Sequence, residues 1–599
     1  MDLREFVDFL RREGELAVVE AEVDPYLEAA EIHRRVVAAE GPALWFARPR
    51  GADFPLVTNL FGTARRVEMA FGRRPQALVR RAVELFQELF PPRPQMLWRY
   101  RDVLGAALHL GLRGVRHAPV LENAGPPRLD RLPVLTCWPE DGGPFLTLPL
   151  VYTEDPAGRG HNLGVYRMQV FDEKTTGMHW QIGKGGGFHY AAAESRGQDL
   201  PVTVYLGGPP AAILAAVAPL PENVPELVLA SLLMGRRFPV VRGHGPHPLA
   251  ATAEFALVGR VPPGERRPEG PFGDHYGYYS LRHDFPVFHV ERMYHRKNAL
   301  YPATVVGKPR QEDFYIGDFL QELLSPLFPL VMPAVRDLWS YGETGYHSLA
   351  AARVTERYGR EAMMAAFRIL GEGQLSLTKF LFVVDGAIDL RDFPRVLTHV
   401  LERTDPETDL YVFAHLAMDT LDYTGPAINL GSKGVWLGLG EPKRELPAEF
   451  VAEELPAGVR EVHVFSPGCL VVGGPSRADE PAFASRLAAA TAFRAWPLVI
   501  VSDEPRRTVA SCVNFLWTVF TRFEPAADIH AREVRIVRNQ LCRSFPVVID
   551  ARLKPGFPAE LRSDPEVAAR VTHRWREYFP DGGVEMGDSD LAHLAPEIS

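Results

Sequence analysis

Residues 145–172 read FLTLPLVYTEDPAGRGHNLGVYRMQVFD, two runs of apolar, β-branched and aromatic residues separated by the turn-forming segment EDPAGRG. Runs of this kind predict β-strands joined by tight connections. Similar short runs continue to about residue 305, namely VTVYLGG, FPVVRG, FALVGRV and FPVFHVERMYH. We therefore expect the central part of the chain to be a β-rich domain of barrel-like or sandwich-like form.

On both sides of this part, the pattern alternates between helix and strand. Residues 2–16 carry apolar side chains near the helical period, and PALWF and RPQALVRRAVELFQELF predict a strand and a helix. Beyond residue 330 the alternation returns, which is typical of α/β layers. The predicted fold class is therefore multi-domain α/β (α+β). We expect an N-terminal α/β domain over residues 1–115, a central domain over 116–325, a C-terminal α/β domain over 326–440 and an extension over 441–599.

Two segments of the C-terminal half have the same pattern, FLFVVDGAIDLRDFPRVLTHVLERTDPETDL and WPLVIVSDEPRRTVASCVNFLWTVFTRFEPAADI. Each is an apolar strand ending at Asp385 or Asp503, then a helix, then an Arg–x–acid–Pro element ending at Asp409 or Asp528. The pattern predicts an internal duplication, with chance similarity of two βα units as the alternative.

Composition excludes several classes of protein. The 599 residues are 46% hydrophobic and 24% charged, with a net charge of −9, so no basic nucleic-acid surface is expected. The four cysteines form no CxxC pair, which argues against a zinc site or a disulfide framework. The charged N-terminus has no apolar signal core, and the apolar stretches are too short to cross a bilayer. We expect a cytoplasmic enzyme that is not transmembrane.

The segment 269–275, EGPFGDH, carries two carboxylates, Glu269 and Asp274, in a loop shaped by glycine and proline. Two carboxylates near one cavity can have different pKa values, so that one of them stays protonated and acts as an acid. The alternative is a solvated turn with two surface acids.

Arg167 follows Asn162 by five residues in a strand-like run, which places the two side chains on opposite faces unless a bulge intervenes. Arginine binds a carboxylate or phosphate through two parallel hydrogen bonds, and the alternative is an arginine at a sheet edge. The run Gly185-Gly186-Gly187 would allow close backbone approach to a ligand, but it matches no nucleotide-binding motif, and a flexible loop is the alternative.

Histidines and serines give no further motif. His179, His189 and His275 lack the spacing of a metal-binding HExxH motif, so they are expected to be structural. No GxSxG sequence is present, which leaves a serine hydrolase of that type without support.

In combination, these segments resemble the UbiD-like decarboxylases over residues 1 to about 440. The resemblance is carried in order by NLGVYRMQVFD, GMHW, EGPFGDHYGYYS, YPATVVG and GSKG, and CWPEDGGPF and TTGMHW look most like the menaquinone-biosynthesis branch. It implies a central split-β-barrel domain that binds prenylated FMN. It also implies a catalytic network of Arg167, Glu269 and Asp274, in which Asp274 returns a proton to the substrate and Glu269 pairs with Arg167.

The same resemblance implies a cofactor site. Tyr166, Arg167, Lys184 and Lys433, the last in GSKG, are expected to contact the flavin. Asn162 and Glu226 match positions that hold a divalent metal, Mn or Mg with K⁺ as a further ion, and this metal binds the cofactor phosphate.

One residue departs from the family pattern. Family members carry a metal-binding histidine where this chain has Gly183, so either another group fills the position or the metal is lost. The neighbouring Lys184 could neutralise the phosphate instead.

The resemblance implies non-oxidative decarboxylation of a hydroxyaryl or naphthoate carboxylic acid in menaquinone or ubiquinone biosynthesis, with a dihydroxynaphthoate as the first expected substrate. The expected partners are this small aromatic acid, a flavin prenyltransferase that supplies the cofactor, and further copies of the chain in a homodimer or larger homo-oligomer. The alternatives are a decarboxylase or carboxylase of another unsaturated acid, a plain FMN oxidoreductase, and a non-catalytic flavin-binding or assembly protein. The change at Gly183 favours the last of these, and the complete Arg–acid–acid set argues against it.

Overall fold

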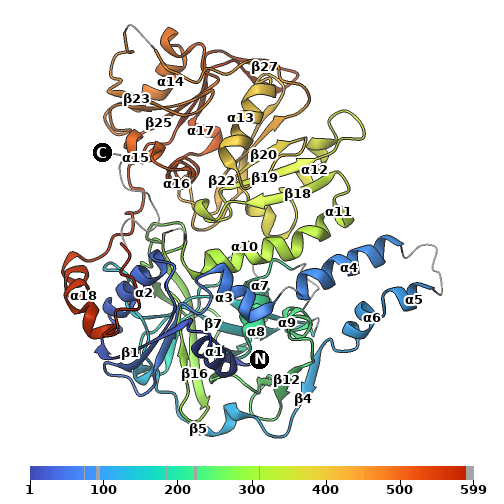
Figure 1. Ribbon diagram of the computed structural model, residues 1–599, viewed down its shortest axis with the longest axis vertical. Coiled ribbons are helices and arrows are strands. Elements are labelled where there is room, and N and C mark those ends of the chain that lie inside the picture. The colour runs from blue at the N-terminus through green and yellow to red at the C-terminus, as the bar shows by residue number, and fades with distance from the viewer. Residues whose placement is uncertain are drawn as a thin grey trace. The chain divides into compact units, whose positions relative to one another are not determined.

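The computed structural model describes residues 1–72, 74–88, 95–158, 160–181, 185–220, 225–308, 310–451 and 454–588. The chain forms two compact units, one of residues 1–324 with the C-terminal stretch from residue 560, the other of residues 325–559. Figure 1 shows the elements of both units. No helix in the described ranges is long and apolar enough to cross a membrane.

The first unit begins with a small mixed sheet in the order β1-β2-β3-β17, comprising β1 (Leu16–Val23), β2 (Ala43–Pro49), β3 (Leu56–Thr58) and β17 (Tyr301–Pro302). It is preceded by α1 (Leu3–Arg12), which starts at Asp2 because the Asp2 and Glu5 side chains each accept the other residue's backbone N–H. Of the apolar positions that predicted this helix, Leu3, Phe6 and Leu10 are buried in the core of this unit and Phe9 is partly buried.

The central sheet of the first unit runs in the order β10-β16-β14-β11-β7-β8, and β5 and β15 also pair with β16. Its strands are β5 (Asn123–Gly125), β7 (Pro149–Glu154), β8 (His161–Val165), β10 (Thr175–Gly177), β11 (Leu200–Leu206), β14 (Phe255–Val261), β15 (Arg266–Glu269) and β16 (His283–His295). Every pairing in it is antiparallel. The β-rich central domain is therefore confirmed, and its closure into a barrel stays a prediction.

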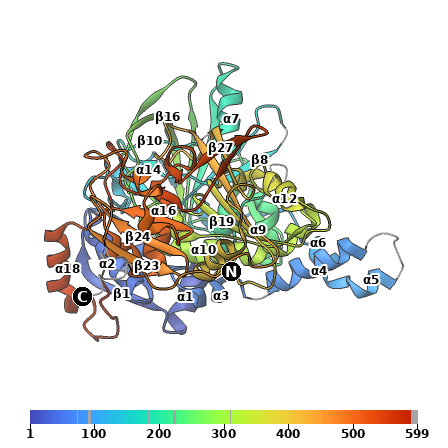
Figure 2. The same cartoon turned by 90° about the horizontal axis from the view of Figure 1, so that it is seen from above.

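The other elements of the first unit are mostly helices. They are α2 (Glu28–Ala38), α3 (Ala64–Phe71), α4 (Arg74–Glu88), α5 (Gln95–Arg99), α6 (Arg101–Ala107), α7 (Gly185–Glu194), α8 (Pro210–Val217), α9 (Glu226–Met234), α10 (Glu312–Leu324) and α18 (Pro565–Tyr578), with short strands β4 (Leu112–Gly114), β6 (Phe145–Leu146), β9 (Met168–Gln169), β12 (Phe238–Val241) and β13 (Leu249–Ala250). In both ribbon views α4, α5 and α6 lie together and extend away from the sheets of this unit (Figures 1 and 2). The C-terminal helix α18 packs against α2 near the other end of the sequence (Figure 1).

The second unit contains two five-stranded sheets of the same topology. The first has the order β18-β19-β20-β22-β21 and the second β23-β24-β25-β29-β26. The strands are β18 (Val335–Ser340), β19 (Leu349–Val354), β20 (Phe380–Val384), β21 (Leu410–Ala417), β22 (Leu430–Gly438), β23 (Glu461–Ser466), β24 (Cys469–Gly473), β25 (Leu498–Ser502), β26 (Ile529–Ala531) and β29 (Val547–Asp550). In each sheet the three inner strands are parallel and both edge strands antiparallel.

The two segments compared in the sequence occupy equivalent places in these sheets. Asp385 follows β20 and accepts the Gly440 N–H at 2.7 Å; Asp503 follows β25 and accepts the Leu553 N–H at 2.7 Å. The long helix after β20 is α13 (Phe393–Arg403), and the long helix after β25 is α16 (Cys512–Arg522), which the short α15 (Pro505–Val509) precedes. The buried faces of both sheets and of α13 and α16 form one core. This shared topology is what a duplication requires.

The correspondence extends to a pair of buried carboxylates. One Asp409 oxygen accepts from Arg360 at 2.7 Å, and the other from the backbone N–H of Asp405 at 2.8 Å and from Lys443 at 3.4 Å. Asp409 is thus held at the start of edge strand β21 by an arginine on one oxygen and a lysine on the other.

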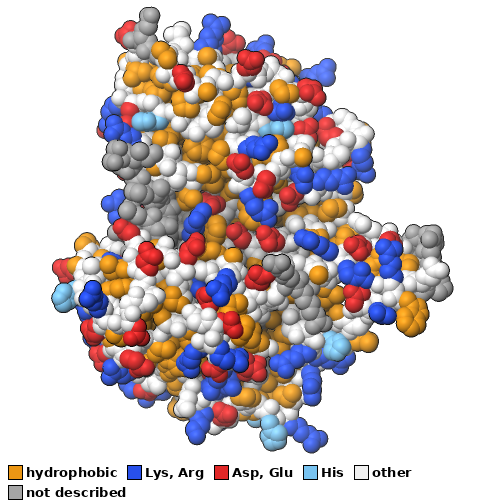
Figure 3. Space-filling model, in the orientation of Figure 1, with side chains coloured by type: hydrophobic (Ala, Val, Ile, Leu, Met, Phe, Trp, Pro, Cys, Tyr) orange, Lys and Arg blue, Asp and Glu red, His pale blue; other side chains and the backbone are white. Residues whose placement is uncertain are grey.

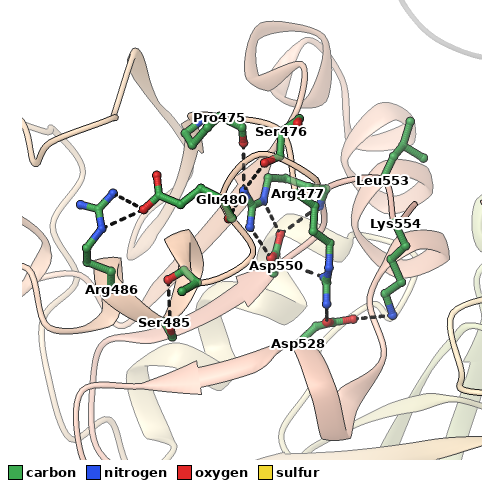
Figure 4. A network of polar contacts seen from close by, with 12 residues as sticks. Pro475, Ser476, Arg477, Glu480, Ser485, Arg486, Asp528, Asp550, Leu553 and Lys554 are labelled. Atoms are coloured by element: carbon green, nitrogen blue, oxygen red, sulfur yellow. Dashed lines mark hydrogen bonds and ion pairs between the residues drawn. The ribbon is translucent and has the colours of Figure 1, made fainter. Parts of the chain in front are cut away.

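The second copy of this arrangement is more deeply buried (Figure 4). Asp528 accepts from Arg477 at 2.6 Å through Oδ1 and lies 2.7 Å from Lys554 through Oδ2. Asp550 and Arg552 extend the network, joined by two hydrogen bonds of 2.7 and 2.8 Å. Side chains buried to this extent are tolerated because each charge has a partner of opposite sign.

The surface carries charges of both signs. On the face drawn in Figure 3, the Lys and Arg side chains of the described residues are interspersed with Asp and Glu over both units. The expected absence of a basic nucleic-acid surface stays a prediction.

Candidate active site

Arg167 lies at the centre of a buried ionic network in the first unit. Its Nε donates to Glu269 Oε1 at 3.0 Å, its Nη1 donates to Asp274 Oδ2, and its Nη2 donates to Ser280 Oγ at 3.0 Å. The guanidinium also stacks on the Phe272 ring, 4.7 Å from the centroid. The structure therefore brings together the three residues expected to form the catalytic network.

A break in the strand explains how Arg167 reaches this position. Strand β8 ends at Val165 and β9 begins at Met168, so Tyr166 and Arg167 lie in irregular backbone between them. Strict alternation would have put Arg167 on the face opposite Asn162. The interruption frees the side chain to turn toward β15 and the loop after it.

Glu269, the last residue of β15, has two side-chain partners. It accepts from Arg167, and its Oε2 lies 2.6 Å from His179 Nδ1. Burial raises the pKa of Glu269, but the charge of Arg167 and the contact with His179 outweigh it and leave the pKa below its ordinary value. Burial, together with the charge of Arg167, lowers the pKa of His179. His179, expected to be structural, therefore belongs to the network.

Asp274 is ionised in this arrangement. Burial raises its pKa, but hydrogen bonds from His275 and the charge of Arg167 outweigh burial and hold the pKa well below its usual range. His275 contributes its backbone N–H at 2.8 Å and Nδ1 at 2.7 Å to the same oxygen. At neutral pH, before any substrate binds, Asp274 is thus a carboxylate, and it must receive a proton before it can donate one.

Asp141 is a site residue that the sequence did not reveal. Its Oδ2 accepts the backbone N–H groups of Cys137 and Trp138, both at 2.9 Å, and its Oδ1 accepts the N–H of Gly273 at 2.8 Å. Burial raises the pKa of Asp141 to about 6. One carboxylate therefore joins the CWPED segment to the residue directly before Asp274.

The Trp138 ring lies in a slot between two glycines. A Cβ on Gly273 would come within 2.1 Å of the ring, and one on Gly307 within 2.5 Å. The indole N–H donates to the Val306 carbonyl at 2.7 Å, and the Arg34 guanidinium lies 4.1 Å from the ring centroid. Glycine is required at both positions because the loop and the YPATVVG segment approach the ring so closely.

A second polar group links the same segments. The Gln169 side chain donates to the Gly142 carbonyl at 2.6 Å and accepts the Gly270 N–H at 2.9 Å. Ser280 accepts from the Phe272 N–H at 3.2 Å as well as from Arg167. The loop that carries Asp274 is thus hydrogen-bonded along its length.

The expected cofactor residues Asn162, Tyr166 and Glu226 lie close together. The Asn162 amide donates to Tyr166 Oη at 3.2 Å, and Glu226 Oε2 accepts the backbone N–H of Leu163 at 3.0 Å. Burial raises the pKa of Glu226. A Cβ on Gly185 would come within 2.2 Å of Asn162 Oδ1, so the first turn of α7 can approach Asn162 only because residue 185 is glycine.

Asn162 and Glu226 carry oxygen donors of the type that the expected divalent metal takes. An amide and a carboxylate oxygen suit Mg or Mn, which commonly bind one or two protein oxygens together with phosphate and water. Within the described ranges, no group of three His, Cys, Asp or Glu side chains is placed to hold a metal. Gly183 and Lys184 lie outside the described residues, so the family difference at Gly183 and the expected phosphate contact of Lys184 stay predictions.

Lys433 belongs to the second unit, at β22. Its ammonium donates to the carbonyls of Ser376 at 2.7 Å and Thr378 at 2.9 Å. Burial lowers its pKa to about 8. Its expected contact with the flavin stays a prediction.

Comparison with known families agrees with this architecture. Three family models match the chain: the N-terminal domain of 3-octaprenyl-4-hydroxybenzoate carboxy-lyase over residues 7–86, its Rift-related domain over 113–309 and its C-terminal domain over 314–438. These are the UbiD_N, UbiD and UbiD_C domains. The chain therefore belongs to the UbiD family of carboxy-lyases.

Relatives extend the similarity to nearly the whole chain. A Chlamydia pneumoniae protein, named as one of the subunits of a 4-hydroxybenzoate decarboxylase, is 50% identical over 583 residues, covering 97% of this chain and 98% of its own. Vanillic acid decarboxylase from Sedimentibacter hydroxybenzoicus, in closed form, shares the fold with a TM-score of 0.66 at 24% identity, over 76% of this chain and 96% of its own. The UbiD-class enzyme HmfF from Pelotomaculum thermopropionicum, in complex with FMN, matches with a TM-score of 0.61 at 24% identity, over 76% and 98%.

Proposed function

We propose that this carboxy-lyase removes CO₂ from an aromatic carboxylic acid bound beside prenylated FMN. The observation that carries the proposal is the buried network in which Arg167 binds both Glu269 and Asp274. Burying two carboxylates and an arginine costs desolvation free energy even when they are paired. Buried ionisable groups with perturbed pKa values are typical of functional sites.

The reaction needs an electron sink that side chains cannot provide. Cleaving the C–CO₂ bond at an unsaturated carbon leaves an electron pair, and prenylated FMN, when bound, supplies the conjugated system that accepts it. The work left to this chain is to orient the acid, to exclude water and to move a proton.

Each network residue has a part in that work. Arg167 would hold the substrate carboxylate or the carboxylate of Glu269, since the N–H groups of its guanidinium donate in several directions. Asp274 would return the proton to the vacated carbon once it has taken one up, and a positioned acid of this kind contributes about 10²–10⁴-fold to a rate. His179 and Ser280 position the two partners of Arg167.

The cofactor would bind along β8 and α7. Asn162 and Glu226 would hold a divalent metal, and Tyr166 and Arg167 would line the flavin. Supporting this assignment, Asn162 Oδ1 faces the glycine run at the start of α7, where backbone N–H groups and the helix dipole favour a phosphate. Lys184 and Lys433 are proposed as further cationic contacts to that phosphate.

The substrate is proposed as a hydroxylated aromatic acid. The name of the Chlamydia pneumoniae relative supports 4-hydroxybenzoate. The CWPEDGGPF and TTGMHW segments support the narrower proposal of a dihydroxynaphthoate in menaquinone biosynthesis. The wider class of proposed substrates is other unsaturated acids, which the protein would decarboxylate or form by carboxylation.

Three structural proposals accompany this function. The central sheet closes as a split barrel around the flavin, the two sheets of the second unit arose by duplication, and the protein acts as a homo-oligomer. The last is supported by family resemblance and by an HmfF variant described as an evolved dimeric form.

The test is to express the chain with a flavin prenyltransferase and to identify the bound cofactor by mass spectrometry. The loaded protein is then incubated with 4-hydroxybenzoate, vanillate and 1,4-dihydroxy-2-naphthoate, and released CO₂ is measured. Prenylated FMN with CO₂ release supports the decarboxylase. Bound flavin without CO₂ from any acid would favour the alternative, a non-catalytic flavin-binding protein, and absence of flavin would overturn the cofactor assignment.

A further inference from the structure

The C-terminal segment passes directly beside the turn that carries Asp274. This turn is closed by two hydrogen bonds, from the Asp274 N–H to the Tyr278 carbonyl at 3.1 Å and from the Gly277 N–H to the Asp274 carbonyl at 2.9 Å. On the outer side of the same turn, Tyr278 forms an antiparallel β-bridge with Glu560. The Leu561 N–H donates to the Gly277 carbonyl at 3.0 Å.

Side chains anchor both ends of this contact. Glu560 lies 3.3 Å from the ammonium of Lys308, and the two side chains are 13% and 4% exposed, so the ion pair is shielded from water. Leu561 is completely buried in the core of the first unit. Lys308 directly follows Gly307, one of the two glycines that enclose Trp138.

The rest of the segment is fastened to the N-terminal layer of the same unit. Helix α18 packs on α2, where Glu28 accepts from Tyr578 Oη at 2.7 Å and from Arg574 at 2.6 Å. Arg35 of α2 donates to the Ala568 carbonyl at 3.0 Å. These contacts hold the segment in place independently of its contact with the turn.

The turn is thus supported from two sides. Asp141 holds the Gly273 N–H on one side, and Glu560 and Leu561 pair with the backbone at the far end of the turn on the other. A backbone fixed at both ends cannot rotate freely, so the Asp274 carboxylate stays directed at Arg167.

We propose that residues 560–588 form a strap that positions Asp274 for proton transfer, and that Glu560 is its positioning residue. The family models end at residue 438, so this part of the active-site support comes from sequence that they do not cover. The inference rests on the proposed function for its effect on turnover, and on contacts alone for its effect on the turn.

The test compares Glu560→Ala, Glu560→Gln and the control Arg576→Ala, an exposed residue of the same strap, in the full-length protein loaded with flavin. We expect Glu560→Ala to lower kcat about 10- to 100-fold with little change in KM, the loss expected of a catalytic group displaced by about 1 Å. Glu560→Gln, which still accepts from Lys308, should recover most of the activity, and Arg576→Ala should match the wild type.

Hydrogen–deuterium exchange gives a readout that does not need activity. In Glu560→Ala, exchange should accelerate in the peptide containing residues 272–280 while α2 and the central sheet stay protected. Unchanged exchange in that peptide, or acceleration throughout the first unit together with a lower melting temperature, would overturn the proposal. If no acid is decarboxylated by any variant, the exchange result still decides whether the strap holds the turn, and only the proposed function fails.

Discussion

The Asp141 carboxylate accepts the backbone N–H of Gly273, the residue directly before Asp274. A group outside the EGPFGDH motif therefore helps to fix its backbone. The same carboxylate accepts two further N–H groups, and it binds all three most strongly while ionised.

Activity is expected to fall on the acid side near the pKa of Asp141. Burial raises that pKa to about 6, so below this pH Asp141 takes up a proton and one oxygen becomes a donor facing N–H groups. Asp141→Asn presents a donor at every pH. Its kcat should be about 10- to 100-fold lower at pH 7, and the acid limb near pH 6 should be absent from its profile. A wild-type limb that persists unchanged in Asp141→Asn would assign it to another group.

Asp274→Asn should lose turnover and keep the cofactor. The amide cannot deliver a proton, and the expected decrease in kcat is about 10²–10⁴-fold. Flavin content, measured by absorbance after gel filtration, should match the wild type because Asn162, Tyr166 and Glu226 are untouched. Substantial CO₂ release by Asp274→Asn would contradict the proton-donor role.

Gly273→Ala should disturb the loop through a clash with Trp138. The added Cβ would come within 2.1 Å of the ring, and overpacking of this kind costs about 1–3 kcal/mol. We expect lower stability to urea and lower kcat. Gly114→Ala, where nothing lies within 4 Å, is the matched control. In the double variant with Trp138→Phe, the combined loss should be smaller than the sum of the single losses.

Asp528→Ala should destabilise the second unit strongly. It leaves Lys554 without its buried counter-charge and Arg477 with Asp550 alone, and breaking a buried ion pair costs about 3–5 kcal/mol. Urea unfolding followed by circular dichroism measures the change. Asp389→Ala, at an exposed site of the same unit, should shift the free energy of unfolding by no more than about 0.5 kcal/mol. Equal effects of both variants would show that the buried network adds nothing to the free energy of unfolding.

Retention of the flavin should weaken above about pH 8 if Lys433 contacts its phosphate. Burial lowers the pKa of Lys433 to about 8, so the side chain is charged below that pH and neutral above it. The flavin retained after dialysis at several pH values should fall across this range in the wild type and stay uniformly low in Lys433→Met. Equal retention by both proteins at pH 7 would remove Lys433 from the cofactor site.

The sequence was sufficient for the strands with clear apolar and β-branched runs and for the residues carried by motifs. FALVGRV is β14 without an error at either end, and Arg167, Glu269 and Asp274 meet as the resemblance implied. At Arg167 the sequence left a bulge open, because the irregular backbone between β8 and β9 cannot be read from residue types alone.

Residues that reach the site through long-range contacts could not be predicted. His179 lies 90 positions from Glu269, and Asp141 lies 132 positions from Gly273. Neither has a local pattern that distinguishes it from a structural histidine or a solvated aspartate. For Asp141 the only signal was the acidic residue in CWPEDGGPF, a segment whose resemblance pointed to a family branch rather than to a role for this side chain.

The bridge between Tyr278 and Glu560 also has a consequence for folding during synthesis. The ribosome makes the turn 282 residues before it makes Glu560 (560 − 278), and at about 5–20 residues per second this interval lasts roughly 14–56 s. During that time the nascent first unit has its Arg167 and both acids but lacks one side of the support for the turn. A chain released early, or cut near its C-terminus, would therefore keep Arg167, Glu269 and Asp274 and lose a contact to the turn that carries Asp274.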